Sequence, residues 1–130
     1  MESERFLIDS NSVIDYLGNK LPSKGVVFMN GVIDAVPNIS VITKIEVLGF
    51  SANKKHTQLL EDFIADSNII LLTDPIINKC IELRKTYKKI KLPDAIIAAT
   101  ALVNQWKLIS RNVEDFKALS ELEIVNPHSL

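Results

Sequence analysis

Short apolar runs alternate with longer amphipathic segments along almost the whole chain. The runs are rich in Ile, Val and Leu and are too short for helices, which is typical of buried β-strands. The segments between them have the apolar spacing of helices that pack on one face. Because strands that alternate with helices pair in parallel, we expect a three-layer α/β/α sandwich around a mainly parallel sheet of about five strands. The expected strands lie at residues 5–9, 38–42, 68–72, 107–110 and 123–125.

Capping signals place the expected helices between these strands. Ser10 or Asn11 can cap the first helix, and Gly18 can end it. Asp74 followed by Pro75 is typical of an N-cap and a first helical residue. The expected helices therefore lie at about residues 11–18, 22–35, 44–50, 54–66, 74–88, 93–105 and 113–119.

Length and composition fit an ordinary globular chain. Its 130 residues are 47% apolar and 24% charged, so we expect one domain, residues 1–130, with a core of its own. The single cysteine, Cys80, excludes an intrachain disulfide. The N-terminus has acids where a signal peptide has bases, and no apolar run approaches the ~20 residues of a membrane span. We expect a soluble, cytoplasmic protein that makes no contact with membranes.

The net charge of −1, from 15 basic and 16 acidic residues, gives no global attraction for nucleic acid. Any such binding must therefore depend on a local patch. Basic residues do gather in RKTYKKIK, from Arg84 to Lys91. This segment is either a solvated helix C-terminus, where cations complement the helix dipole, or a contact for a nucleic-acid backbone.

Acidic or amide side chains follow the expected strands or begin the helices after them. They are Asp9, Glu46, Asp94, Asn112 and Asp115. In parallel α/β sheets, ligands bind at the carboxyl ends of the strands, where these side chains would meet. Converging carboxylates repel one another unless a cation neutralises them, and oxygen-only ligands suit Mg²⁺ or Mn²⁺. A bound ion of this kind supports phosphodiester hydrolysis.

Each acid also has a purely structural explanation. Asp94 and Asp115 lie in first helical turns, where the helix dipole favours acids. Glu46 could pair with Thr43 in a capping box, because TKIE has the required spacing. Asp9 is harder to explain in this way, since it ends an apolar strand. The convergence of four segments on one edge favours the metal site.

Three segments, FLIDSNSVIDYL, ISVITKIEVL and KLPDAIIAATALVNQWKLISRNVEDF, occur in the order and rough spacing of PIN domains. The chain most closely resembles the VapC-type toxin ribonucleases of type II toxin–antitoxin systems, from Phe6 to about Val125. The resemblance implies a single PIN-like nuclease domain that cleaves RNA with Mg²⁺ or Mn²⁺. It also implies a cognate antitoxin and self-association into homodimers.

The resemblance assigns catalytic and metal-binding roles to four acids, Asp9, Glu46, Asp94 and Asp115. Many relatives have Asp where this chain has Asn112, so Asp115 is the expected acidic substitute. Asp9 and Asp94 would bind the ion most directly, and Glu46 would bind it or orient the attacking water. Four further residues are expected to position these groups or to bind substrate: Asn11, Thr43, Arg111 and Asn112.

Other function classes fit the residues less well. A receiver-type phosphoacceptor needs paired acids after the first strand, and a dehalogenase-like phosphatase needs D-x-D there. This chain has DSN, with Asn11 in place of the second acid. A PIN-like module that only binds RNA or protein remains the alternative, because a fold does not imply an activity. The joint presence of Asp9, Glu46 and Asp94 favours the nuclease.

Overall fold

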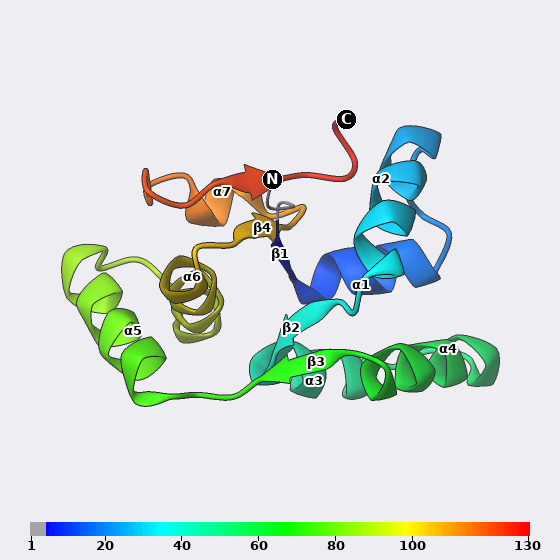
Figure 1. Cartoon of the computed structure of the whole chain (residues 1–130), viewed down its shortest axis with the longest axis horizontal. Coiled ribbons are helices and arrows are strands. Elements are labelled where there is room, and N and C mark those ends of the chain that lie inside the picture. Colours follow the sequence, from blue (N-terminus) through cyan, green and yellow to red (C-terminus); the bar gives the residue numbers. More distant parts are fainter. Residues whose placement is uncertain (1–4) are drawn as a thin grey trace.

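A parallel five-stranded sheet lies at the centre of the computed structural model, which describes residues 5–130 (Figure 1). The strand order is β3-β2-β1-β4-β5, and every neighbouring pair is parallel. The strands are β1 (Phe6–Ile8), β2 (Asn38–Ser40), β3 (Asn68–Ile70), β4 (Lys107–Ile109) and β5 (Ile124–Val125). The predicted fold class is confirmed, and the order reverses between β1 and β4, which is where open α/β sheets bind ligands.

Helices cover both faces of this sheet. They are α1 (Ser10–Leu17), α2 (Ser23–Asp34), α3 (Val41–Leu48), α4 (Lys54–Ala65), α5 (Asp74–Thr86), α6 (Leu92–Asn104) and α7 (Val113–Phe116). In Figure 1, α5, α6 and α7 lie on one side of the sheet, and α1, α2 and α4 lie on the other. Within residues 5–130, no helix has both the length and the apolar character to cross a bilayer.

Two hydrophobic clusters hold these layers together. Successive residues of a strand point to opposite faces, so Leu7 packs with α5, α6 and α7 while Ile8 packs with α1 to α4. Leu108 and Ile109 of β4 divide in the same way. Because both faces are covered, the strands are continuous apolar runs rather than alternating patterns.

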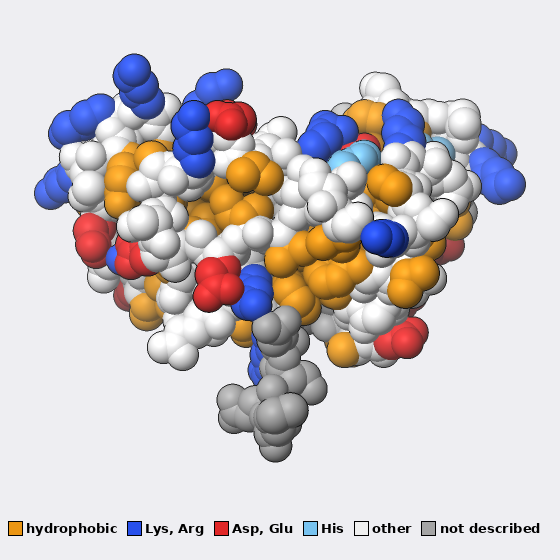
Figure 2. Space-filling view, turned by 90° about the horizontal axis from the view of Figure 1, so that it is seen from above, with side chains coloured by type: hydrophobic (Ala, Val, Ile, Leu, Met, Phe, Trp, Pro, Cys, Tyr) orange, Lys and Arg blue, Asp and Glu red, His pale blue; other side chains and the backbone are white. Residues whose placement is uncertain are grey.

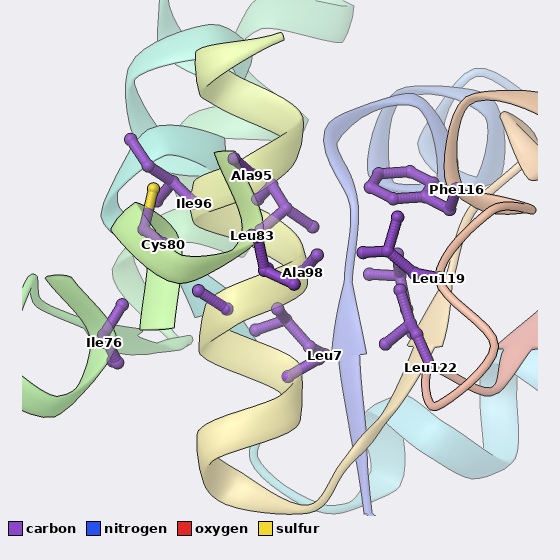
Figure 3. Packing of buried hydrophobic residues seen from close by; sticks show 14 residues of the cluster. Leu7, Ile76, Cys80, Leu83, Ala95, Ile96, Ala98, Phe116, Leu119 and Leu122 are labelled. Carbon is purple, nitrogen blue, oxygen red and sulfur yellow. The ribbon is translucent and has the colours of Figure 1, made fainter. Parts of the chain in front are cut away.

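Small side chains set the position of α6. The helix is buried from Ala95 to Ala101, and Figure 3 shows Ala98 near Leu83 of α5 and Leu7 of β1 in one cluster. Alanines let α6 approach the sheet and α5 closely, with little loss of side-chain entropy. This close approach brings the first turn of α6, which holds Asp94, to the carboxyl edge of the sheet.

The boundaries of two elements at this edge differ from the prediction. Asp9, rather than Ser10 or Asn11, caps α1, because its side chain accepts a hydrogen bond from the backbone N–H of Ser10. The strand expected at 38–42 ends at Ser40, whose side chain caps α3. Thr43 therefore lies inside α3, so the capping box that could have explained Glu46 does not form.

The other differences are shorter helices and a shifted cap. Thr73, not Asp74, is the N-cap residue of α5, and this helix ends at Thr86 rather than near residue 88. Helix α7 is a single turn that ends at Phe116 instead of residue 119. The predicted end of α1 is confirmed, since Gly18 is its C-cap. The early end of α5 places Lys88 and the lysines after it in a loop.

Candidate active site

Asp9 lies at the point where the strand order reverses, directly after β1. Its side chain is buried, with 6% of the residue exposed, and three groups hold it. The backbone N–H of Ser10 donates to Oδ1 at 2.8 Å, and Ser110 Oγ donates to Oδ2 at 2.8 Å. Asn11 Nδ2 donates to Oδ2 at 3.2 Å. The carboxylate is therefore held from the start of α1 and from the end of β4.

Glu46 lies on the second turn of α3, one turn later than the prediction placed it. The Ser10 hydroxyl donates to Glu46 Oε1 at 2.6 Å. Ser10 therefore joins Asp9 through its backbone and Glu46 through its side chain. This contact, rather than helix capping, accounts for the orientation of Glu46.

Asp94 lies in the first turn of α6 and interacts electrostatically with all three of the other predicted acids. Its pKa is raised to about 6, most by burial and then by the charges of Asp115, Asp9 and Glu46, while Lys91 opposes the rise. Like charges shift a pKa in this way only when they are near one another. The structure therefore brings the four predicted acids into one electrostatic cluster, from the buried Asp9 to the exposed Glu46 and Asp115.

The pKa of Asp9 is also raised, but for reasons that oppose one another. Burial raises it most, and the hydrogen bonds from Ser110 and from the Ser10 backbone lower it. The charge of Glu46 raises it again, and the bond from Asn11 lowers it. Hydrogen bonds to a carboxylate favour its charged form. The network around Asp9 thus partly offsets its burial.

Asn11 links the ends of β1 and β4. Its Nδ2 donates to Ser110 Oγ at 3.3 Å as well as to Asp9, and its Oδ1 accepts from the Arg111 N–H at 2.9 Å. The Asn112 N–H donates to the same Ser110 Oγ at 3.1 Å. The predicted positioning role of Asn11 therefore has a structural basis. Ser110 was missed by sequence reasoning, although it directly precedes the Arg-Asn pair that was singled out.

Arg111 is engaged by a buried acid that the sequence reasoning also missed. Its guanidinium donates to Asp15 Oδ2 at 2.8 Å, and His128 Nε2 lies 2.8 Å from the same oxygen. Asp15 follows Asn11 by four residues on α1, so both contact Arg111 from one helix face. The guanidinium is held beside α1, and Arg111 thus positions the loop after β4.

Thr43 is fully buried on α3, and its Oγ1 has no hydrogen-bond partner among the described residues. It precedes Glu46 by three residues and therefore lies on the same face of the helix. A buried hydroxyl without a partner is costly, so the folded protein keeps this oxygen at the expense of stability.

The donors in this cluster are all oxygen or amide groups, which suit a hard cation. Among residues 5–130, however, no group of three or more His, Cys, Asp or Glu side chains is arranged to hold an ion as it stands. Mg²⁺ commonly uses one or two carboxylates and keeps several waters. The residues therefore fit an ion held directly by one or two of the acids and through water by the others.

Comparisons with known proteins agree with this geometry. The PIN domain model matches residues 6–122. A toxin–antitoxin complex from Klebsiella pneumoniae contains a chain that is 31% identical, with a TM-score of 0.72, covering 98% of this chain and 100% of that one. No curated protein matches the chain.

Two further solved structures share the fold at lower identity. FitAcB from Neisseria gonorrhoeae is 24% identical with a TM-score of 0.75, covering 96% of this chain and 99% of its own. VapBC2 from Rickettsia felis, bound to a DNA fragment from its promoter, is 19% identical with a TM-score of 0.77, covering 93% and 97%. The chain belongs to the PIN domain family.

Proposed function

We propose that the protein is a metal-dependent endoribonuclease and the toxin of a type II toxin–antitoxin pair. One observation carries the proposal: at the carboxyl edge of the sheet of a PIN domain, the charges of three acids from separate segments, Asp9, Glu46 and Asp115, raise the pKa of a fourth, Asp94. Mutual repulsion of this kind disfavours the charged form of the site unless a cation is bound. The metal-free arrangement is therefore one that a cation would stabilise.

Asp9 and Asp94 would hold Mg²⁺ or Mn²⁺ most directly, with Asp115 and Asn112 completing the site. When bound, the ion would lower the pKa of a water and stabilise charge on the leaving oxygen. Asp9 is already oriented by three hydrogen bonds, so it needs little rearrangement. Glu46 has one oxygen engaged by Ser10, which leaves the other to orient the attacking water.

The same proposal includes a cognate antitoxin, supported by the Klebsiella pneumoniae neighbour, which is described as a toxin–antitoxin complex. Homodimer formation and an RNA substrate follow from the family resemblance. The cytoplasm, where such systems would meet RNA, is the proposed location.

Matched aspartate variants test the nuclease. Asp94→Asn removes a cluster acid, and Asp74→Asn removes an exposed acid from the first turn of α5. We expect the wild type and Asp74→Asn to cleave labelled RNA with Mn²⁺ but not with a chelator, and Asp94→Asn to lose at least 100-fold in rate. Binding of Mn²⁺ is followed in parallel by calorimetry.

Equal cleavage by all three proteins would mean that a contaminant or another site cuts the RNA. If purified wild type binds RNA but never cuts it with either ion, the binding-module alternative replaces the nuclease.

A further inference from the structure

A cleft of about 380 Å³ opens beside the acid cluster, between the loop that joins α5 to α6 and the segment of α7. Tyr87, Lys88 and Lys89 line it from the loop, and Asp115 and Lys117 line it from the other side. Asp115 also raises the pKa of Asp94, so the cleft and the acid cluster share a wall.

The lysines of this loop lie beyond the end of α5, so they cannot be attributed to a helix C-terminus, where cations complement the helix dipole. Helix α5 ends at Thr86, so only Arg84 and Lys85 lie in its last turn and complement its dipole. The backbone N–H of Ile90 donates to the Tyr87 carbonyl at 3.1 Å, which closes a tight turn. Lys88 and Lys89 are the exposed central residues of this turn.

These two lysines have no ion-pair partner among the described residues. Lys117, which also lines the cleft, pairs with Glu114 at 2.7 Å. Lys91, which follows the turn, lowers the pKa of Asp94. Adjacent like charges repel one another and add nothing to the core, which the loop reaches through Tyr87 and Ile90. Folding alone therefore does not account for the pair.

The charge distribution is complementary to a polyanion that crosses the acid cluster. Figure 2 shows a notch between two lobes at the top of the view, with Lys and Arg side chains on both rims. If a phosphodiester chain contacted the acids alone, its negative charges would be repelled by four carboxylates. Cations beside them offset this repulsion for the flanking phosphates.

We propose that the cleft at the Tyr87–Ile90 turn binds the RNA that flanks the scissile bond. Lys88 and Lys89 contact phosphates, and the Tyr87 ring gives a wall on which a base can stack. The proposal rests on the proposed nuclease function for its substrate class. The aromatic wall and the shared Asp115 favour RNA over an acidic peptide.

The test measures RNA binding without cleavage, in the Asp94→Asn protein with a chelator present. The double change Lys88→Ala/Lys89→Ala is compared with Lys54→Ala/Lys55→Ala, which removes two adjacent exposed lysines from the first turn of α4. Fluorescence anisotropy with a short single-stranded RNA is recorded over a salt series, and thermal unfolding checks that each variant is folded.

We expect the loop variant to bind about 3- to 10-fold more weakly, with a salt slope shallower by about 1 to 1.4, since each phosphate contact contributes about 0.7. The α4 variant should match its parent. In cleavage assays with Asp94 intact, the loop variant should raise KM with kcat nearly unchanged.

Equal affinity and slope in the two double variants would overturn the cleft, and so would a parent that binds no RNA at low salt. A labelled poly-glutamate peptide is tested in the same way. If the loop variant binds this peptide more weakly but binds RNA as well as its parent does, the cleft takes an acidic protein and the proposal is overturned. If the protein does not cleave RNA but still binds it through Lys88 and Lys89, the nuclease proposal fails and the proposed RNA-binding cleft is supported.

Discussion

Asp9 and Asp94 lie at the same edge of the sheet, yet the protein holds them in opposite ways. Three hydrogen bonds fix the buried Asp9 between β1 and β4. Asp94 is more exposed, accepts no hydrogen bond from another described residue, and has a pKa raised to about 6. Asp9 is therefore part of the structural scaffold, whereas Asp94 carries a charge that no hydrogen bond of the scaffold stabilises.

This difference separates the contributions of the two acids to stability. A carboxylate that satisfies buried donors contributes to folding, because its removal leaves those donors unpaired. A carboxylate repelled by its neighbours opposes folding until a cation or a proton neutralises it. Removing the two acids should thus change the free energy of unfolding with opposite signs, although we expect both changes to remove the proposed cleavage.

The largest effect is expected for Asp9→Ala. The change removes the cap of α1 and leaves the Ser110 hydroxyl and the Ser10 N–H without their acceptor. We expect the free energy of unfolding to fall by about 2–4 kcal/mol. Urea unfolding at pH 7 in metal-free buffer measures this. A loss below about 0.5 kcal/mol would show that water replaces the carboxylate and that Asp9 is not a scaffold residue.

The intermediate effect is expected for Asp94→Asn and depends on pH. The pKa of Asp94 in the folded protein, about 6, exceeds the ordinary 3.8, so the folded state binds this proton more tightly than the unfolded state. The free energy of unfolding therefore falls as the pH rises from about 4 to about 6 and stays lower above that range. Removing the charge should restore about 1–3 kcal/mol at pH 7 to 8 and nothing below pH 4.

Urea unfolding of wild type, Asp94→Asn and Asp74→Asn across this pH range measures the effect. Asp74→Asn should follow the wild-type profile, since its acid lies outside the cluster. Mn²⁺ should stabilise the wild type more than Asp94→Asn and so narrow the gap between them. A destabilised Asp94→Asn at pH 8 would contradict the comparison, because Asp94 would then be held like Asp9.

The fold was predictable because each strand is a short apolar run and at least one helix separates it from the next strand. Strand ends were less predictable, because single caps decide them. The Ser40 side chain accepts a hydrogen bond from the Ile42 N–H, so α3 begins early and β2 is short. In the same way, the Asp9 side chain caps α1. Such caps compete with the apolar pattern over only one or two residues.

The acids of the site were predictable from their places after strands, but their partners were not. Ser10 and Ser110 have nothing unusual in their local sequence. Ser110 contacts Asp9 only because β1 and β4 are neighbours, and the two residues are 101 positions apart. Asp15 was missed for the same reason, since His128 and Arg111 reach it from distant segments.

The smallest effect is expected for Thr43→Val, which tests whether a buried hydroxyl on α3 belongs to the scaffold or to the site. Thr43 is fully buried, and its Oγ1 has no partner among the described residues. Valine keeps the shape and removes the unpaired oxygen, so we expect the metal-free protein to gain about 0.5–1 kcal/mol in its free energy of unfolding. Cleavage should fall if this oxygen holds water near Glu46.

Thr100→Val is the control. The Thr100 hydroxyl donates to the Ile96 carbonyl at 2.7 Å within α6, and its loss leaves an ordinary helix. A loss of stability in Thr43→Val as large as that of Asp9→Ala would place Thr43 in the scaffold instead.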